Sequence, residues 1–316
     1  MNNDYVLITP CRNESEFMRR TLDSVVNQTI PPALWVIVDD GSTDGTPAIL
    51  SEYAAIHPFI QLVSRVNRGH RSVGPGVIDA FYAGYDIIEI SRFEYICKLD
   101  LDLDLPPRYF ELLIKRMNEN PRLGCCSGKP YYVDKGTGKL VSEFCGDENA
   151  IGASKFYRAA CFSQIGGFVR EVMWDGIDGH RCRMLGWIAC SWDEPALRFI
   201  HLRPMGSSHK GILTGRMRHG FGQYFMGTDL VYMMVSALYR MIRPPFIIGG
   251  VAMLWGYVQS LMIGKPRFDD LEFRKFLRKY QWLCLLKGKK RATALLNQQQ
   301  AEGWDPEAPS RYSVLR

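Results

Sequence analysis

Apolar runs that alternate with amphipathic stretches restrict the fold of the N-terminal third more than any other feature. The apolar runs at residues 5–9, 34–38 and 61–64 predict strands. The stretch at 14–27 predicts a helix between the first two, and the stretch at 76–89 predicts a helix after the third. Because strand, helix and strand repeat in this order, we expect an α/β fold with a mostly parallel central sheet. The carboxyl edge of such a sheet builds the ligand site.

A further strand, predicted at residues 95–99, runs directly into three acidic residues, Asp100, Asp102 and Asp104. If the strand stays extended, the three carboxylates point to the same side. Their mutual repulsion makes this arrangement costly without a cation. Mg²⁺ and Mn²⁺ prefer oxygen ligands and are typically shared with substrate phosphates, so the motif suits a metal site. A solvated turn is the alternative that the motif alone leaves open.

Composition excludes several classes of protein. The chain has 316 residues, of which 47% are hydrophobic and 23% charged, and this excludes disorder and a disulfide miniprotein. A mean hydropathy of −0.13 argues against a polytopic membrane protein. The N-terminus lacks the features of a secretory signal, so we expect a cytoplasmic chain. Its cysteines should then be thiols, and none shows zinc spacing.

Positive charge is concentrated at the C-terminus. Residues 264–316 hold 12 basic and 6 acidic side chains, which accounts for the whole net charge of +6. This uneven distribution suits a basic tail that faces an anionic surface, and it does not suit a nucleic-acid-binding domain. A solvated helix face is the alternative.

A charge-free segment precedes that tail. Residues 246–263 contain no charged side chain, and as a helix they would extend ~27 Å, short of the ~30 Å hydrocarbon core. An interfacial or re-entrant helix therefore competes with a single span. Basic residues at both ends, Arg240, Arg243, Lys265 and Arg267, favour a helix that lies on the inner face of the cell membrane. A buried helical hairpin remains the structural alternative.

Five blocks in order along the chain resemble the inverting family 2 glycosyltransferases with a GT-A fold. They are VLITPCRNESEFMRRTLDSVVNQT, VIVDDGSTDGT, KLDLDLDLPP, GASKFYRAACFSQIGGF and WDGIDGHRCRMLGW. The resemblance implies a GT-A domain over residues 1–222, with a nucleotide-binding half at about 1–106 and an acceptor half at about 107–222. An apolar membrane-associated helical segment at 223–263 and the basic tail at 264–316 would follow.

The resemblance also implies roles for single residues. Pro10, Asn13 and Glu14 match the first nucleotide-binding loop, Asp39 and Asp40 match the acidic pair that meets the base, and Asp100 and Asp102 match the D-x-D that holds metal and diphosphate. We expect two arginines to contact the nucleotide as well, Arg12 in the first loop and Arg68 in the Gly-rich loop at 67–70.

Asp175 falls where the family places its catalytic base, ahead of a helix that ends in Gly186-Trp187. Many members have Glu-Asp at this point, whereas this chain has Trp174-Asp175, with Asp178 as a reserve. Inversion needs a base to deprotonate the acceptor hydroxyl and a cation to absorb charge on the departing diphosphate. One carboxylate cannot do both. Without the resemblance, two acids favoured by the helix dipole would be the simpler interpretation.

The Q-x-x-R-W motif of many processive relatives is not found, which argues against polymerising activity. A basic segment occupies its place, and His209, Arg216 or Arg218 there could contact the diphosphate, with a solvated turn as the alternative. His201 and His209 are also candidate metal ligands, although lone histidines are weak evidence.

The resemblance therefore implies an enzyme that uses Mn²⁺ or Mg²⁺ and a nucleotide diphosphate sugar, with a UDP-sugar favoured. The acceptor would be a hydroxyl of a glycan or a lipid-linked molecule, in cell-envelope or exopolysaccharide synthesis. Two alternatives stay open: a polyprenyl-phosphate glycosyltransferase, and a catalytically silent membrane-associated subunit. The intact acidic blocks argue against the silent subunit, because clustered carboxylates are destabilising without a ligand.

Overall fold

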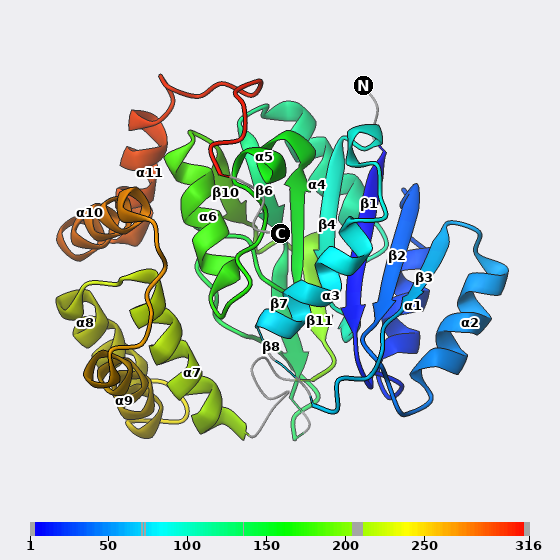
Figure 1. Cartoon of the computed structure of the whole chain (residues 1–316), viewed down its shortest axis with the longest axis horizontal. Coiled ribbons are helices and arrows are strands. Elements are labelled where there is room, and N and C mark those ends of the chain that lie inside the picture. Colours follow the sequence, from blue (N-terminus) through cyan, green and yellow to red (C-terminus); the bar gives the residue numbers. More distant parts are fainter. Residues whose placement is uncertain (1–3, 71, 73, 135, 204–210, 313–316) are drawn as a thin grey trace.

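A computed structural model describes residues 4–70, 72, 74–134, 136–203 and 211–312 of the chain. Its centre is a seven-stranded sheet of order β10-β6-β9-β4-β1-β2-β3 (Figure 1). The strands are β1 (Tyr5–Cys11), β2 (Leu34–Asp39), β3 (Ile60–Ser64), β4 (Tyr95–Leu99), β6 (Leu123–Ser127), β9 (Ser154–Arg158) and β10 (Ile188–Ser191). All neighbours pair in parallel except at β9, which runs antiparallel to β4 and β6. The expected mostly parallel α/β sheet is confirmed.

Helices cover both faces of this sheet. They are α1 (Met18–Val26), α2 (Thr46–Ile56), α3 (Pro75–Tyr85), α4 (Tyr109–Glu119), α5 (Ala159–Gln164) and α6 (Trp174–Met184), with short 3₁₀ turns at Ile90–Arg92 and Pro195–Leu197. Alternation along β1 sets the two layers. Tyr5 and Leu7 pack with α1 and α4, whereas Val6 and Ile8 pack with α3, α5 and α6.

A second, four-stranded sheet lies beside the edge of the central sheet at which the ligand site is expected. It has the order β5-β11-β7-β8, formed by β5 (Leu103–Asp104), β7 (Lys129–Val133), β8 (Leu140–Ser142) and β11 (Arg198–His201). β5 follows β4 after only three residues and pairs antiparallel with β11. This pairing brings β11 beside the acidic segment, although the two are about a hundred residues apart in sequence.

The C-terminal third is helical. Its elements are α7 (Gly211–Met226), α8 (Leu230–Met241), α9 (Ile248–Ile263), α10 (Leu271–Lys287) and α11 (Lys289–Gln299). These helices gather at one end of the molecule, beside α6, while α2 lies at the other end (Figure 1). α7 crosses the domain boundary expected at residue 222. The apolar segment forms α9, and no helix in the described part of the chain is both long and apolar enough to cross a membrane.

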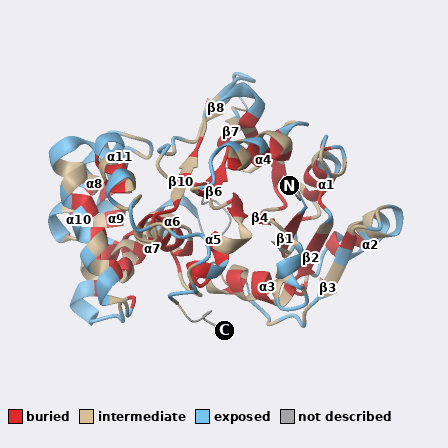
Figure 2. Ribbon diagram, turned by 90° about the horizontal axis from the view of Figure 1, so that it is seen from above, coloured by how far each residue is buried: buried red, intermediate tan, exposed pale blue. Residues whose placement is uncertain are grey.

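The basic tail is also folded. Within it, α10 packs on α6 and on α11 through Phe273, Leu277 and Leu296. Beyond α11 the chain returns to the central domain, where the Trp304 ring lies 5.3 Å from Trp187. Figure 2 shows buried residues along the central strands and exposed outer faces on the C-terminal helices.

Candidate active site

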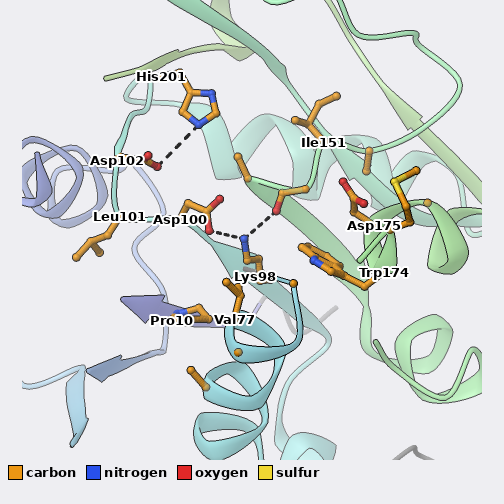
Figure 3. A pocket seen from close by; sticks show the side chains of 18 of the residues that line it. Pro10, Val77, Lys98, Asp100, Leu101, Asp102, Ile151, Trp174, Asp175 and His201 are labelled. Carbon is orange, nitrogen blue, oxygen red and sulfur yellow. Dashed lines mark hydrogen bonds and ion pairs between the residues drawn. The ribbon is translucent and has the colours of Figure 1, made fainter. Parts of the chain in front are cut away.

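A pocket of about 620 Å³ opens at the carboxyl ends of β1, β2 and β4. Loops after these strands form one side of it, and the start of α6 forms another (Figure 3). Residues expected from the sequence to bind nucleotide, metal or acceptor line it from several elements: Pro10, Arg12, Glu14, Asp40, Asp100, Asp102, Asp175 and Arg218. The fold therefore brings most of the expected site residues to one place.

The loops after β1 and β2 are joined to each other by hydrogen bonds. The Asn13 side-chain oxygen accepts a hydrogen bond from the Thr43 amide at 2.8 Å, and the Asn13 amide donates to Ser42 Oγ at 2.9 Å. Asn13 adopts a left-handed backbone with φ of 55°, which Asn tolerates better than most residues. The Glu14 amide donates to Thr46 Oγ1 at 2.9 Å. Residues 15–17 form a turn, and α1 begins at Met18 and not at Glu14 as expected. Asn13 therefore joins the two loops that form this side of the pocket and does not itself line it.

Two arginines bind Asp40, the second acid of the pair at the end of β2. Asp40 accepts hydrogen bonds from Arg65 Nη1, at 2.9 Å, and from Arg68 Nη2. Asp39 accepts from the Ser42 amide at 2.9 Å and stays buried at the end of its strand. Arg12 donates to the Asp40 carbonyl at 2.7 Å. Arg68, expected at the nucleotide, here positions Asp40 instead.

The acidic segment after β4 does not stay extended. Asp104 points away from the pocket, where it accepts a hydrogen bond from Arg20 Nε at 2.9 Å. Asp100 accepts from Lys98, whose Nζ also donates to the Gly152 carbonyl at 3.0 Å (Figure 3). Burial and the neighbouring Asp102 raise the pKa of Asp100, against the opposite influence of Lys98. The alternation that predicts three carboxylates on one side is wrong for Asp104, because the chain bends between β4 and β5.

Asp102 lies between Arg203 and His201. Arg203 Nε donates to Asp102 Oδ2 at 2.8 Å, and Arg203 Nη2 donates to Glu14 at 2.9 Å. His201 Nε2 is 3.8 Å from Asp102 Oδ1, and its Nδ1 is 2.7 Å from Glu143 Oε2. Burial alone would lower the pKa of His201, but the two carboxylates outweigh it and raise the pKa.

Sequence reasoning missed Arg203 and gave His201 little weight. The pairing of β11 with β5 brings both residues beside the acidic segment, and no local sequence pattern predicts that pairing. A basic residue at the end of a strand that pairs beside the acidic segment is the only signal that could have found them.

The N-terminal part of α6 presents Asp175 to the pocket and buries Asp178. The helix begins after Met173, whose φ of 64° is left-handed, and Trp174 packs between two lysines at 5.2 Å from Lys98 Nζ and 5.7 Å from Lys155 Nζ. Asp175 follows and lines the pocket, close to Gly152, where a Cβ would lie 2.8 Å from Asp175 Oδ2.

Asp178 is fully buried behind the pocket wall. Lys155 Nζ donates to both of its carboxylate oxygens at 2.6 Å, and the Tyr157 hydroxyl donates to one of them. Burial raises the pKa of Asp178, opposed mainly by Lys155. Asp178 therefore serves the packing of α6 on β9, in the geometry that this structure shows.

Helices of the C-terminal third close the remaining side. Arg218 and His219 of α7 and Lys289 at the start of α11 line the pocket. Burial lowers the pKa of His219 to about 4. Arg216 lies near Arg240, away from the pocket lining, and the nearby positive charge and burial lower its pKa. His209 lies outside the described residues.

Among the residues that the structure describes, no three His, Cys, Asp or Glu side chains gather closely enough to hold a metal ion by themselves. The pocket nevertheless places two carboxylates and an imidazole along one wall, at Asp100, Asp102 and His201.

The sequence from residue 6 to residue 171 matches the family model described as Glycosyl transferase family 2. The chain belongs to this family. As a family 2 glycosyltransferase it is 33% identical to the chondroitin synthase of Escherichia coli over 133 residues, which cover 42% of this chain and 18% of that protein. It is 32% identical to the poly-beta-1,6-N-acetyl-D-glucosamine synthase of Staphylococcus epidermidis over 126 residues, 40% of this chain and 28% of that protein.

The family 2 chain thus spans less than a third of each of these relatives. Among solved structures, GalNAc-T7 with UDP, GalNAc and Mn²⁺ superposes with a TM-score of 0.58 at 13% identity, over 92% of this chain and 57% of that one. This likeness concerns the fold alone, and with the family match it confirms the expected GT-A-like architecture.

Proposed function

We propose that this family 2 protein is a metal-dependent inverting glycosyltransferase that moves one sugar from a nucleotide diphosphate sugar to a hydroxyl of a glycan or lipid-linked acceptor. The observation that carries the proposal is the separation of two acidic groups across one pocket. Asp100, Asp102 and His201 lie on one side, and Asp175 lies on the other (Figure 3).

Asp100, Asp102 and His201 are the residues that would hold Mn²⁺ or Mg²⁺. Such ions usually take one or two carboxylates from the protein and further oxygens from substrate phosphates, so a cluster of three protein ligands is not required. Glu143 holds His201 Nδ1 and leaves Nε2 directed toward Asp102, as carboxylates commonly do behind metal-binding histidines. A bound divalent ion would neutralise charge on the departing diphosphate. Lys98 and Arg203, which hold the two aspartates here, would share that charge.

Asp175 is suited to act as the base. It lies in the first turn of α6, at the positive end of the helix dipole. Lys155 Nζ and Asn149 Nδ2 donate to its backbone carbonyl at 2.6 and 3.1 Å, which fixes the residue while its carboxylate faces the pocket. In the proposed step, Asp175 takes the acceptor proton, the acceptor oxygen bonds to the anomeric carbon, and the bond from that carbon to the diphosphate breaks.

Three features support the choice of donor and acceptor. Asp40, which the resemblance assigns to the nucleotide base, lines the pocket together with Arg12, and Arg218 would add a cation for the diphosphate. The GalNAc-T7 structure is described with UDP, and the two named relatives are polysaccharide synthases. We therefore propose a UDP-sugar donor and an acceptor in cell-envelope or exopolysaccharide synthesis, at the cytoplasmic face of the membrane.

The variant Asp175→Asn tests the proposal. Loss of a general base lowers kcat by about 10²–10⁴-fold, and nucleotide affinity should stay within about twofold because Asp175 faces the acceptor side. Hydrolysis and transfer of UDP-sugars by purified protein give the rates, and calorimetry gives the affinity. Equal activity in Asp175→Asn would remove Asp175 from the mechanism. Activity retained only with a polyprenyl phosphate acceptor would favour that alternative, because an anionic acceptor needs less help from a base.

A further inference from the structure

An exposed apolar surface covers the outer side of α8, α9 and the turn between them. We call this surface the hairpin face. Its large apolar side chains are between 40 and 67% exposed, and they are Leu230, Val231, Met234, Val235, Leu238, Tyr239, Ile242, Phe246, Ile247, Ile248, Val251, Trp255, Leu261, Met262 and Ile263. Contiguous exposed apolar surface of this extent is rare on monomeric proteins and marks an interaction site.

The exposure of α9 follows from how the helix is anchored. Ile248, Val251, Trp255 and Met262 are spaced by three, four and seven residues, which places them on one stripe. The opposite side packs tightly on α7, where a Cβ on Gly256 would lie 2.1 Å from the Met217 carbonyl oxygen. α9 is therefore fixed by glycine-mediated packing on one side, and its apolar stripe faces outward.

The charged side chains between residues 230 and 268 have one sign. Residues 230–268 contain four basic side chains and no acidic ones. Arg240 and Arg243 lie at one end of α9, and Lys265 and Arg267 lie at the other. Arg243 lies 4.3 Å from the Phe144 ring, and Lys265 lies 4.5 Å from the Phe221 ring. Within the described residues, none of the four forms an ion pair with a carboxylate.

We propose that the hairpin face docks on the surface of an anionic phospholipid bilayer, with α9 lying in the plane of the interface. A second copy of this chain would bring four more cations to the same face, whereas lipid phosphates would neutralise them. α9 is about 24 Å long, which is too short to span the hydrocarbon core but suits an interfacial helix. Trp255 and Tyr239 add aromatic rings of the kind found at membrane interfaces.

This placement has a consequence for the pocket. α7 packs on α9 and also supplies Arg218 and His219 to the pocket lining, so the pocket lies one helix away from the hairpin face. A lipid-linked acceptor could then reach the pocket without leaving the bilayer. That consequence rests on the proposed function, whereas docking itself does not, and vesicle binding without substrate measures docking alone.

Co-sedimentation of the full chain with lipid vesicles tests the docking. We expect binding to vesicles that mix phosphatidylcholine and phosphatidylglycerol in equal parts, and weaker binding to phosphatidylcholine alone or at high salt. The variant Ile247→Glu/Trp255→Glu should bind the anionic vesicles at least about tenfold more weakly. Ile56→Glu is the matched control, because Ile56 of α2 is 67% exposed at the other end of the molecule, and it should bind like the unaltered protein.

Two outcomes would overturn the proposal. One is failure of the unaltered protein to sediment with anionic vesicles at low salt, which requires no variant to fold. The other is a dimer in light scattering that the Ile247→Glu/Trp255→Glu variant dissociates while vesicle binding stays unchanged, which would make a second copy the occupant of the hairpin face.

Discussion

Lys155 and Tyr157 on β9 decide which acid of α6 can reach a substrate. Both bind Asp178, and the ammonium group of Lys155 is as deeply buried as the carboxylate that it meets. Asp175, three residues earlier, keeps its side chain in the pocket. Substituting Asp175 and substituting Asp178 should therefore have different effects, although the sequence offers both as candidates for the catalytic base.

Asp178→Asn should destabilise the fold and not primarily the chemistry. Removing one partner of a buried ion pair leaves Lys155 without a full counter-charge and costs about 3–5 kcal/mol in the free energy of unfolding. Urea denaturation measures this. Asp175→Asn is the matched control and should cost less than about 1 kcal/mol, since its side chain faces a pocket. Equal destabilisation by the two variants would show that Asp175 is also structural.

His201 should make stability depend on pH in the metal-free protein. Its pKa is raised in the fold above the ordinary 6.5, so its contribution is fully present below pH 6.5 and is lost as the pH rises through the folded pKa. In the presence of a chelator, the unaltered protein should therefore lose stability relative to His201→Gln as the pH rises through that window. A constant difference between the two across the window would contradict the raised pKa.

At the scale of elements, much of the central sheet could be predicted. The run at 95–99 is apolar and bounded by charge, and the strand has those limits. The predicted start of α1 at Glu14 was wrong, because residues 15–17 form a turn and the regular helix begins only at Met18. Arg203 and His201 could not be placed, since β11 reaches Asp102 through pairing between distant segments. Local periodicity carries no information on such pairs.

Glycine packing between α7 and α9 gives a prediction at the same scale. Gly256→Ala should force the two helices apart, because its Cβ would meet the Met217 carbonyl oxygen at 2.1 Å, and should cost about 1–3 kcal/mol in the free energy of unfolding. Gly303→Ala is the control, since a Cβ there meets no described heavy atom within 4 Å. Thermal unfolding compares the two, and equal transition temperatures would contradict the tight packing.

Across the whole molecule, the last described residues tie the C-terminal helices back to the central domain. Gln164 Nε2 donates to the carbonyls of Asp305, Pro306 and Ala308 at 2.9 to 3.0 Å, and Trp304 packs on Trp187. Charge counting predicted a basic tail that faces an anionic surface. It could not reveal that α10, α11 and this segment pack on the domain, because those contacts join residues that are about a hundred positions apart or more.

Trp304→Ala should therefore weaken the whole fold. The half-buried ring leaves a gap against Trp187, and we expect a loss of about 1–3 kcal/mol in the free energy of unfolding. The exposed neighbour Glu302 supplies the control, because Glu302→Ala should change the free energy of unfolding by less than about 0.5 kcal/mol. Denaturation curves that coincide for Trp304→Ala and the unaltered protein would mean that the segment does not contribute to stability.

We propose that the pocket binds a nucleotide diphosphate together with a divalent metal held at Asp100, Asp102 and His201. Calorimetric titration with UDP, GDP and dTDP, each with and without Mn²⁺, tests this proposal. We expect one nucleotide, UDP by preference, to bind at least about tenfold more tightly with Mn²⁺, and Asp102→Asn to remove this gain. Binding of none of the three nucleotides, or binding that Mn²⁺ leaves unchanged, would contradict it.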